Sequence, residues 1–232
     1  MKLSAVIPCF SVTEELKDMA LKCAKSIRDQ VDELIIAEDA DIYWHDLHQI
    51  SDVYVVHPRL DYKKNCNLGW KLATGDFVLQ ANSDSFLIEG NLQDLCIDGI
   101  GIAWCEETGN EIHLSQAMGA FFVTPRSFFE QLGGWDNVKE HVWDFSLFNK
   151  LSKLGAPQTI RSVRISHPRA GATSYNYVKD YNGRPGSIDK WTEEQKQKQL
   201  AHEEAFPAKE IDWARHQQRM IEDLVYAKRW QV

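Results

Sequence analysis

Short apolar runs alternate with amphipathic segments from the beginning of the chain. Residues 3–7 form an apolar run that Pro8 ends, which is typical of a buried strand. Behind Ser11, which has capping-box spacing to Glu14, apolar residues recur at steps of three and four, as on one face of a helix. A second apolar run follows at residues 34–37. This order predicts a strand, a helix and a second strand, the β–α–β unit of an α/β sheet.

The same alternation continues to about residue 154. Strands are expected over residues 53–56, 76–81, 100–105 and 119–124, and helices over residues 62–73, from Pro125 to near Gly133 and Gly134, and over residues 143–154. Strands that alternate with helices predict an α/β fold, with a mixed, mostly parallel sheet flanked by helices on both faces.

The composition changes from about residue 183. Arg184, Pro185 and Gly186 interrupt the pattern, and a segment rich in Gln, Glu and Lys follows. A last helix is expected after Pro207, with a loosely apolar face and mixed charges. Mixed charges favour packing on the main domain or on a second copy of the chain over binding to a membrane surface. We therefore expect one domain over residues 1–183 and a helical extension over residues 184–232.

Length and charge narrow the function classes. The chain has 232 residues, of which 44% are hydrophobic and 26% charged, as in an ordinary soluble domain. Its 26 basic and 34 acidic residues give a net charge of −8, whereas proteins that bind nucleic acid normally present a basic surface. We therefore expect no nucleic-acid partner.

The cysteines and the apolar segments predict where the protein resides. The 5 cysteines are scattered and include no C-x-x-C pair, a pattern that suits a reducing compartment. No signal-peptide pattern opens the sequence, and no window approaches the roughly 18 apolar residues of a membrane span. The expectation is a cytoplasmic protein without a transmembrane segment.

Two polar clusters each end a predicted strand: Glu38 with Asp39, and Asn82 with Ser83 and Asp84. Open α/β sheets bind ligands at the carboxyl ends of their strands. Carboxylates at such an edge bind hard cations such as Mg²⁺ or Mn²⁺ together with substrate phosphates. Such residues also form ordinary turns, which is the better interpretation of either cluster alone. Two clusters that close consecutive α/β units favour a binding site.

The glycine pattern excludes two common kinds of phosphate site. No G-x-G-x-x-G follows the first strand, where Pro8, Cys9, Phe10 and Ser11 stand instead, and no P-loop sequence occurs. A bound cation would neutralise phosphates in their place. At ~4 Å and an effective dielectric near 20, each unit of phosphate charge gains about 4 kcal/mol before desolvation. A cation thus reconciles an acidic protein with an acidic substrate.

An ordered set of motifs resembles the family 2 glycosyltransferases of the GT-A fold. The set comprises VIPCF, LIIAEDA, N-x-G, A-x-G-D leading to NSD, LGGWD and WDFSLFNKLSKLG, and it extends from Leu3 to His167. The resemblance implies the GT-A fold. It also implies transfer of a sugar, with inversion, from a nucleotide-sugar to an acceptor hydroxyl, with UDP-sugar as the default donor. The acceptor would be a glycan, a lipid-linked group or a protein.

The resemblance also assigns residues to the donor. Pro8 and Phe10 match the loop after the first strand that contacts the base. Glu38 and Asp39 match the paired acids that hold the base and the ribose. Lys64, just ahead of the N-x-G motif, would reach the base or a phosphate.

A metal site follows from the same resemblance. Asn82, Ser83 and Asp84 match the D-x-D motif, in which Asp84 would bridge Mn²⁺ or Mg²⁺ to the diphosphate. His167 resembles the downstream histidine that completes the metal site, although a structural histidine before a turn is the competing interpretation. Asn82 stands where the family has its first Asp, which removes one anionic ligand.

Residues for the transfer step come from the two late motifs. Asp144 matches the general base, while Trp135 or Trp143 is expected to stack on the acceptor. A carboxylate at the start of a helix is also a common structural feature, and the helix dipole would favour its ionised form. Trp143 replaces the usual Glu before the base. An inactive nucleotide-sugar or glycan-binding module is therefore the alternative function. A nucleotidyltransferase is disfavoured, because it would carry a glycine-rich basic signature after the first strand, and that signature is absent here.

Overall fold

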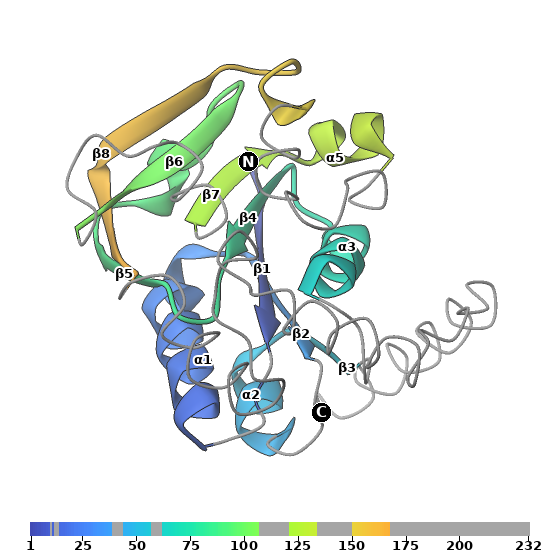
Figure 1. Cartoon of the computed structure of the whole chain (residues 1–232), viewed down its shortest axis with the longest axis vertical. Helices are drawn as coiled ribbons and strands as arrows, with labels where there is room; N and C mark the ends of the chain where they lie inside the picture. The colour runs from blue at the N-terminus through green and yellow to red at the C-terminus, as the bar shows by residue number, and fades with distance from the viewer. Residues whose placement is uncertain are drawn as a thin grey trace, which may run out of the picture. The chain divides into compact units, whose positions relative to one another are not determined.

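The computed structural model describes residues 1–9, 11, 14–38, 44–56, 62–106, 121–133 and 150–167. In these residues eight strands form one mixed sheet in the order β3-β2-β1-β4-β7-β6-β8-β5 (Figure 1). Their bounds are Leu3–Cys9 (β1), Glu33–Glu38 (β2), Val53–Val56 (β3), Phe77–Ala81 (β4), Phe86–Glu89 (β5), Ile100–Cys105 (β6), Phe121–Pro125 (β7) and Pro157–Ser166 (β8). The expected α/β sheet is confirmed.

The first half of the sheet is parallel. Strand β1 pairs in parallel with β2 and β4, and β2 pairs in parallel with β3. The apolar run of β1 does not end at Pro8, because the strand continues to Cys9 and Pro8 is buried opposite Ala37. The pairing of β1 with β4 ends at Val6, whereas its pairing with β2 continues to Cys9. Pro8, which has no N–H, therefore lies in the part of β1 that is an edge on the β4 side, where a proline is tolerated.

The second half of the sheet is mostly antiparallel. Strand β7 pairs antiparallel with β4 and β6, β8 pairs in parallel with β6, and β5 pairs antiparallel with β8. Strand β5 is not among the expected elements, because three of its four residues are only partly buried or exposed. It matters for the site, since it follows directly after the polar cluster that ends β4.

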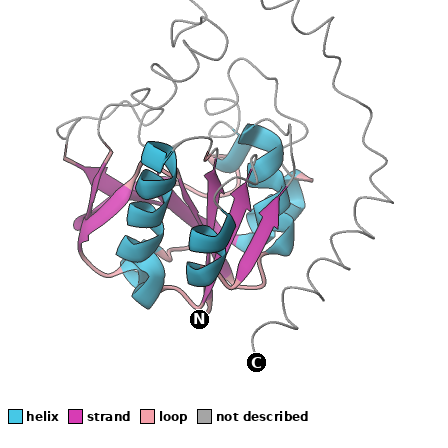
Figure 2. Ribbon diagram, turned by 90° about the horizontal axis from the view of Figure 1, so that it is seen from below, coloured by secondary structure: helices cyan, strands magenta, loops and turns pink. Residues whose placement is uncertain are grey.

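Helices cover both sides of the sheet (Figure 2). The helices are α1 (Glu14–Ile27), α2 (Trp44–Ile50), α3 (Tyr62–Leu72) and α5 (Arg126–Leu132), with short 3₁₀ helices η1 (Arg28–Gln30) and η2 (Leu92–Leu95). None of the described helices is both long and apolar enough to cross a membrane. The described residues belong to one unit, Met1–Pro168, so the expected extension over residues 184–232 lies outside them.

Helix ends differ from the expectation in two places. Helix α1 begins at Glu14, so Ser11 does not cap it, and among the described residues the buried Ser11 hydroxyl has no hydrogen-bond partner. Pro125 ends β7 and precedes α5 instead of lying in its first turn. Helix α5 ends as expected, at Gly133, whose φ of 69° is the left-handed conformation that glycine adopts readily.

Side chains of β1 alternate between two packing environments. Leu3, Ala5, Ile7 and Cys9 belong to the buried cluster that also contains the apolar face of α1. The residues between them face α3: a Cβ on Gly69 of α3 would lie 2.2 Å from Cγ1 of Val6. The glycine of the N-x-G motif is therefore required by the close approach of α3 to β1.

Gly69→Ala is expected to lower the free energy of unfolding by about 1–3 kcal/mol, because the added methyl overpacks a rigid β-branched neighbour. Chemical denaturation measures this change. The control is the same substitution in a Val6→Ala background, where the clash is relieved and the cost should largely disappear. Equal costs in the two backgrounds would contradict the packing explanation.

Three aspartates fasten the amino ends of the parallel strands. Each stands immediately before β2, β3 or β4. The carboxylates of Asp32 and Asp52 accept a hydrogen bond from a backbone N–H of the neighbouring strand, and that of Asp76 accepts one from the residue just before β1. The three contacts are Leu3 N to Asp32 Oδ2 (2.7 Å), Leu34 N to Asp52 Oδ2 (2.7 Å) and Lys2 N to Asp76 Oδ2 (2.8 Å).

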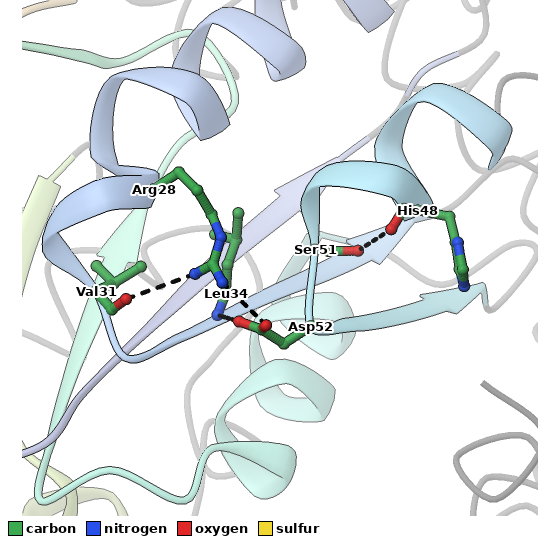
Figure 3. Close-up of polar contacts among 6 residues, drawn as sticks. All are labelled: Arg28, Val31, Leu34, His48, Ser51 and Asp52. Carbon is green, nitrogen blue, oxygen red and sulfur yellow. Dashed lines mark hydrogen bonds and ion pairs between the residues drawn. The ribbon is translucent and has the colours of Figure 1, made fainter. Parts of the chain in front are cut away.

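Figure 3 shows the middle contact. Asp52 also pairs with Arg28, at 3.0 Å between Oδ1 and Nη2, so one carboxylate joins η1, which follows α1, to the start of β2. The Asp52 N–H in turn donates to the carbonyl of Leu34 at 2.9 Å. These bonds fix the edge of the sheet that lies opposite the carboxyl ends of the same strands.

Candidate functional site

The carboxyl ends of β1, β2 and β4 meet at one edge of the sheet. Cys9, the last residue of β1, pairs with Glu38, the last residue of β2. On the other side, Val6 of β1 pairs with Gln80 of β4, so the cluster that begins with Asn82 lies at nearly the same level. The two polar clusters that the sequence places after consecutive strands are thus at one edge, as expected for a ligand site.

A tight turn follows β4 and carries the second cluster. The N–H of Ser85 donates to the carbonyl of Asn82 at 2.9 Å, and Asn82 and Asp84 are both partly exposed. The chain then enters β5, which pairs with the end of β8 through Phe86 and Ser166. This pairing brings the turn beside the residue that follows β8, which is His167.

Asp84 and His167 are in direct contact. The distance from Asp84 Oδ1 to His167 Nε2 is 3.2 Å, and the two side chains are 13% and 6% exposed. A carboxylate oxygen and an imidazole nitrogen that lie this close together could both bind one Mn²⁺ ion. Mg²⁺ and Mn²⁺ commonly complete their coordination with water and substrate phosphate. Among the described residues no three His, Cys, Asp or Glu side chains form a metal-binding group. The pair would supply two of the ligands of a bound cation.

Glu38 is completely buried at the end of β2, with an exposed fraction of 0%. Its Oε1 accepts a hydrogen bond from the backbone N–H of Ser11 at 2.9 Å. The resemblance assigns Glu38 to the donor, but no pattern in the sequence indicates the Ser11 N–H as its partner. The contact joins β2 to the connection between β1 and α1.

Buried thiols lie beside these acids. Burial raises the pKa of Cys9 well above its ordinary value, and the nearby Glu38 and Cys23 raise it further. Burial also raises the pKa of Cys23, with a smaller contribution from the charge of Asp84. Both thiols are therefore neutral at physiological pH.

Several predicted site residues lie outside the described residues: Phe10, Asp39, Trp135, Trp143 and Asp144. Lys64 lies on α3, but its side chain is not among those described. Pro8 lies within β1 and is buried, one residue before the strand ends. The structure thus brings Asp84 and His167 together and puts Glu38 and Asn82 at the same edge.

No model of a known protein family matches the chain, and neither does any curated protein sequence. Solved structures do resemble it. S. aureus TarS superposes with a TM-score of 0.57 at 12% identity, over 79% of this chain and 39% of that one. Residues 1–349 of S. aureus TarS in complex with UDP give a TM-score of 0.55 at 12% identity, over 77% and 64%.

A third neighbour is a mannosyltransferase, PcManGT from Pyrobaculum calidifontis, in complex with GDP-Man and Mn²⁺. Its TM-score is 0.52 at 14% identity, over 76% of this chain and 59% of that one. The chain therefore spans less than two thirds of the length of each of these proteins. At such low identity the likeness concerns the fold, and it confirms the predicted GT-A fold.

Proposed function

We propose that the protein is a metal-dependent inverting glycosyltransferase of the family 2 type. It moves a sugar from a nucleotide-sugar to an acceptor hydroxyl. The observation that carries this proposal is the contact of Asp84 with His167 at 3.2 Å, at the carboxyl edge of a GT-A sheet. A partly exposed carboxylate and a buried imidazole that converge at a ligand-binding edge are a combination typical of functional sites.

The donor is proposed to be a UDP-sugar. Structural neighbours support a nucleotide-sugar donor, since they include complexes with UDP, with UDP-GlcNAc and with GDP-Man and Mn²⁺. The base and ribose would lie against the ends of β1 and β2, at Pro8, Phe10, Glu38 and Asp39. Lys64 would add a positive charge near the base or a phosphate.

The metal would be held by Asp84 and His167, with Asn82 as a neutral neighbour in the same turn. When bound, Mn²⁺ or Mg²⁺ neutralises the diphosphate and makes it a better leaving group. The side chains themselves have a simpler role. Asp84 supplies the negative charge that attracts the cation, and the β5–β8 pairing keeps His167 at its side.

Asp144 is proposed to take the proton of the acceptor hydroxyl as the new bond forms. Inversion requires one base on the face opposite the leaving group, as in inverting hydrolases, and a carboxylate suffices. Trp135 or Trp143 would offer an apolar face to the acceptor, which is a glycan, a lipid-linked group or a protein.

The proposal is tested by incubating the protein with UDP- and GDP-sugars and measuring the released nucleoside diphosphate, with Mn²⁺ or with a chelator. We expect metal-dependent release from one donor, and NMR of the product should show the inverted anomer. Retention of the anomeric configuration would contradict the inverting mechanism.

A catalytically inactive nucleotide-sugar or glycan-binding module is the second candidate. It is favoured by Asn82, which brings a neutral amide to the turn where the family motif has a carboxylate. Tight nucleotide binding without cleavage of any donor would support it. Asn82→Asp should then raise the affinity for Mn²⁺ in the presence of nucleotide, because it restores a second anionic oxygen to the turn.

A further inference from the structure

We propose that Arg161, held on the ring of Trp104, binds a negatively charged group of the acceptor, a carboxylate or a phosphate. The inference rests on the proposed function and deepens it, since it gives the acceptor a chemical class. Neither residue belongs to the proposed donor or metal site.

The two side chains stack at the surface of the protein. The guanidinium carbon of Arg161 lies 5.0 Å from the centroid of the Trp104 ring, within the range of a cation–π contact. Trp104 is partly exposed in β6, and Arg161 is exposed in β8, which pairs with β6 (Figure 1). A guanidinium stacked on an aromatic face keeps the N–H groups at its rim free to bind a carboxylate or a phosphate through two parallel hydrogen bonds.

No carboxylate neutralises the charge of Arg161 in the part of the chain that the structure describes. Its neighbour Arg164 differs, because it pairs with Glu89 at 2.8 Å between Nη1 and Oε2 and also pairs with Glu106. The charge of Arg164 is thus used within the protein. The guanidinium of Arg161 is available to an anionic ligand, although the chain as a whole has a net charge of −8.

An irregularity of β8 presents the Arg161 side chain. The pairing of β8 with β6 passes from Ile160 directly to Arg164, so residues 161–163 have no counterpart in β6. A bulge of this kind re-aims the side chains of its strand, and bulges are common beside functional sites. The bulge therefore accounts for the place of Arg161 over the ring on the neighbouring strand.

Contacts with η2 and with the residue after β5 hold this bulge in place. The Ser162 hydroxyl donates to Oδ2 of Asp94, which lies in η2, at 3.3 Å. Gly90, directly after β5, has a φ of 106°, and a Cβ there would lie 2.2 Å from the carbonyl oxygen of Ser162. Glycine is therefore required at this position, and the residues around the bulge are fitted to it.

Trp104 lies at the same level of the sheet as the turn after β4. Ile102 of β6 pairs with Phe122 of β7, and Phe122 pairs with Gln80 of β4. Both pairings are antiparallel, so β6 and β4 run in the same direction. Two residues further along these strands stand Trp104 and Asn82. Two strand spacings separate them, a distance of about 10 Å.

The order of the strands separates this position from the donor. The proposed contacts with the base and ribose lie at the ends of β2 and β1, and the proposed metal site lies at the turn after β4. Strand β6 is on the other side of β4 from β1, with β7 between β4 and β6. A group bound by Arg161 therefore lies beyond the diphosphate, on the side from which an acceptor would reach the sugar.

The test titrates the full chain, without donor or metal, with glucuronate, glucose 6-phosphate and glucose. NMR follows the indole N–H of Trp104 and the Nε–H of Arg161. We expect both anionic sugars to bind at least about tenfold more tightly than glucose, because hydrogen bonds to charged groups are the stronger ones. The anion that binds more tightly identifies the charged group of the acceptor. Equal affinities for all three sugars would overturn the proposal.

Arg161→Ala should lower the affinity for the anionic sugars to that for glucose. Because Arg161 is exposed, this variant should fold like the wild type. Lys25→Ala is the matched control, since it removes an exposed positive charge from α1, which packs on the opposite face of the sheet from Trp104. It should change no affinity. Unchanged binding of the anionic sugars in Arg161→Ala would overturn the proposal.

Trp104 is a positioning residue, because it acts through the guanidinium that it supports. Trp104→Leu should weaken the binding of the anionic sugars by about fivefold, whereas Trp104→Phe keeps an aromatic face and should stay within about twofold of the wild type. Equal losses in the two variants would contradict the role of the ring. If Trp104→Leu does not fold, Arg161→Ala still decides whether the anion binds here.

In the transfer assay, Arg161→Ala should raise the KM for an anionic acceptor by about tenfold at unchanged kcat, and it should leave the affinity for UDP with Mn²⁺ unchanged. An equal loss of affinity for UDP would assign Arg161 to the donor phosphates and overturn the proposal. The two proposals fail in different ways. A wild-type protein that binds no nucleotide would contradict the proposed function, whereas the sugar titration needs neither nucleotide nor metal and tests Arg161 by itself.

Discussion

Asp84→Asn is expected to abolish manganese-dependent nucleotide binding while leaving the fold intact. The substitution keeps the size of the side chain and removes the charge that lies 3.2 Å from His167. One unit of charge at ~4 Å from a cation corresponds to about 4 kcal/mol at an effective dielectric near 20, before desolvation. We therefore expect a loss of affinity of at least about a hundredfold, measured by titration calorimetry with Mn²⁺ and with a chelator.

Asp98→Asn is the control for this change. Asp98 is exposed in the loop between η2 and β6, so its substitution removes the same charge away from the proposed site. The Asp98→Asn variant should bind nucleotide in the presence of Mn²⁺ with the same affinity as the wild type. Unchanged metal-dependent binding in Asp84→Asn would show that the metal is held elsewhere and would contradict the role proposed for the pair.

Asp144→Asn is expected to leave nucleotide affinity unchanged and to lower the rate of sugar transfer by about 10²–10⁴-fold. The amide keeps the shape of the side chain but cannot accept the proton of the acceptor hydroxyl. Two quantities are measured on the same preparation: the rate of nucleoside diphosphate release with acceptor present, and the affinity for nucleotide.

The control for the base is Ser146→Ala, which alters the same segment of the sequence without removing a carboxylate. It should transfer sugar at the wild-type rate. A fully active Asp144→Asn variant would exclude Asp144 as the base. Loss of nucleotide binding in that variant would instead assign Asp144 to the donor site.

The parallel half of the sheet could be predicted because its strands are buried. Nearly every residue of β1, β2 and β4 is inaccessible, so each is a mostly apolar run in the sequence. Strand β8 gives a weaker signal, since Val163 and Ile165 are its fully buried residues. Strand β5 likewise has few buried residues. Hydrophobic periodicity cannot distinguish strands with so few buried residues from loops.

The contacts of the site depend on pairing between distant strands. Asp84 and His167 were both predicted from the motifs, but their contact requires β5 to pair with β8, and that register is absent from local sequence. The bond from Ser11 to Glu38 likewise requires β1 beside β2. Local sequence favoured Ser11 as a helix cap instead, because capping residues and loop residues are of the same types.

The roles of a glycine and of three aspartates also depend on contacts that local sequence does not reveal. The N-x-G motif is part of the resemblance to the glycosyltransferases, and in the structure its Gly69 is required by the close approach to Val6. Asp32, Asp52 and Asp76 are typical turn residues in the sequence, but each accepts a hydrogen bond from a backbone N–H at the start of β1 or β2 or just before it. The sequence contains the residue types, and the fold decides which backbone groups they meet.

The central claim is a nucleotide site that depends on a metal, and a thermal-shift panel of UDP, GDP, CMP and dTDP, each with Mn²⁺ or a chelator, tests it most directly. A ligand at 100 times its Kd stabilises a protein by about 2.7 kcal/mol, which raises the Tm of a domain of this size by roughly 5–10 °C. The account predicts such a shift with UDP in the presence of Mn²⁺ and its loss with the chelator. A panel in which no nucleotide moves the Tm, or in which the chelator changes nothing, would contradict it.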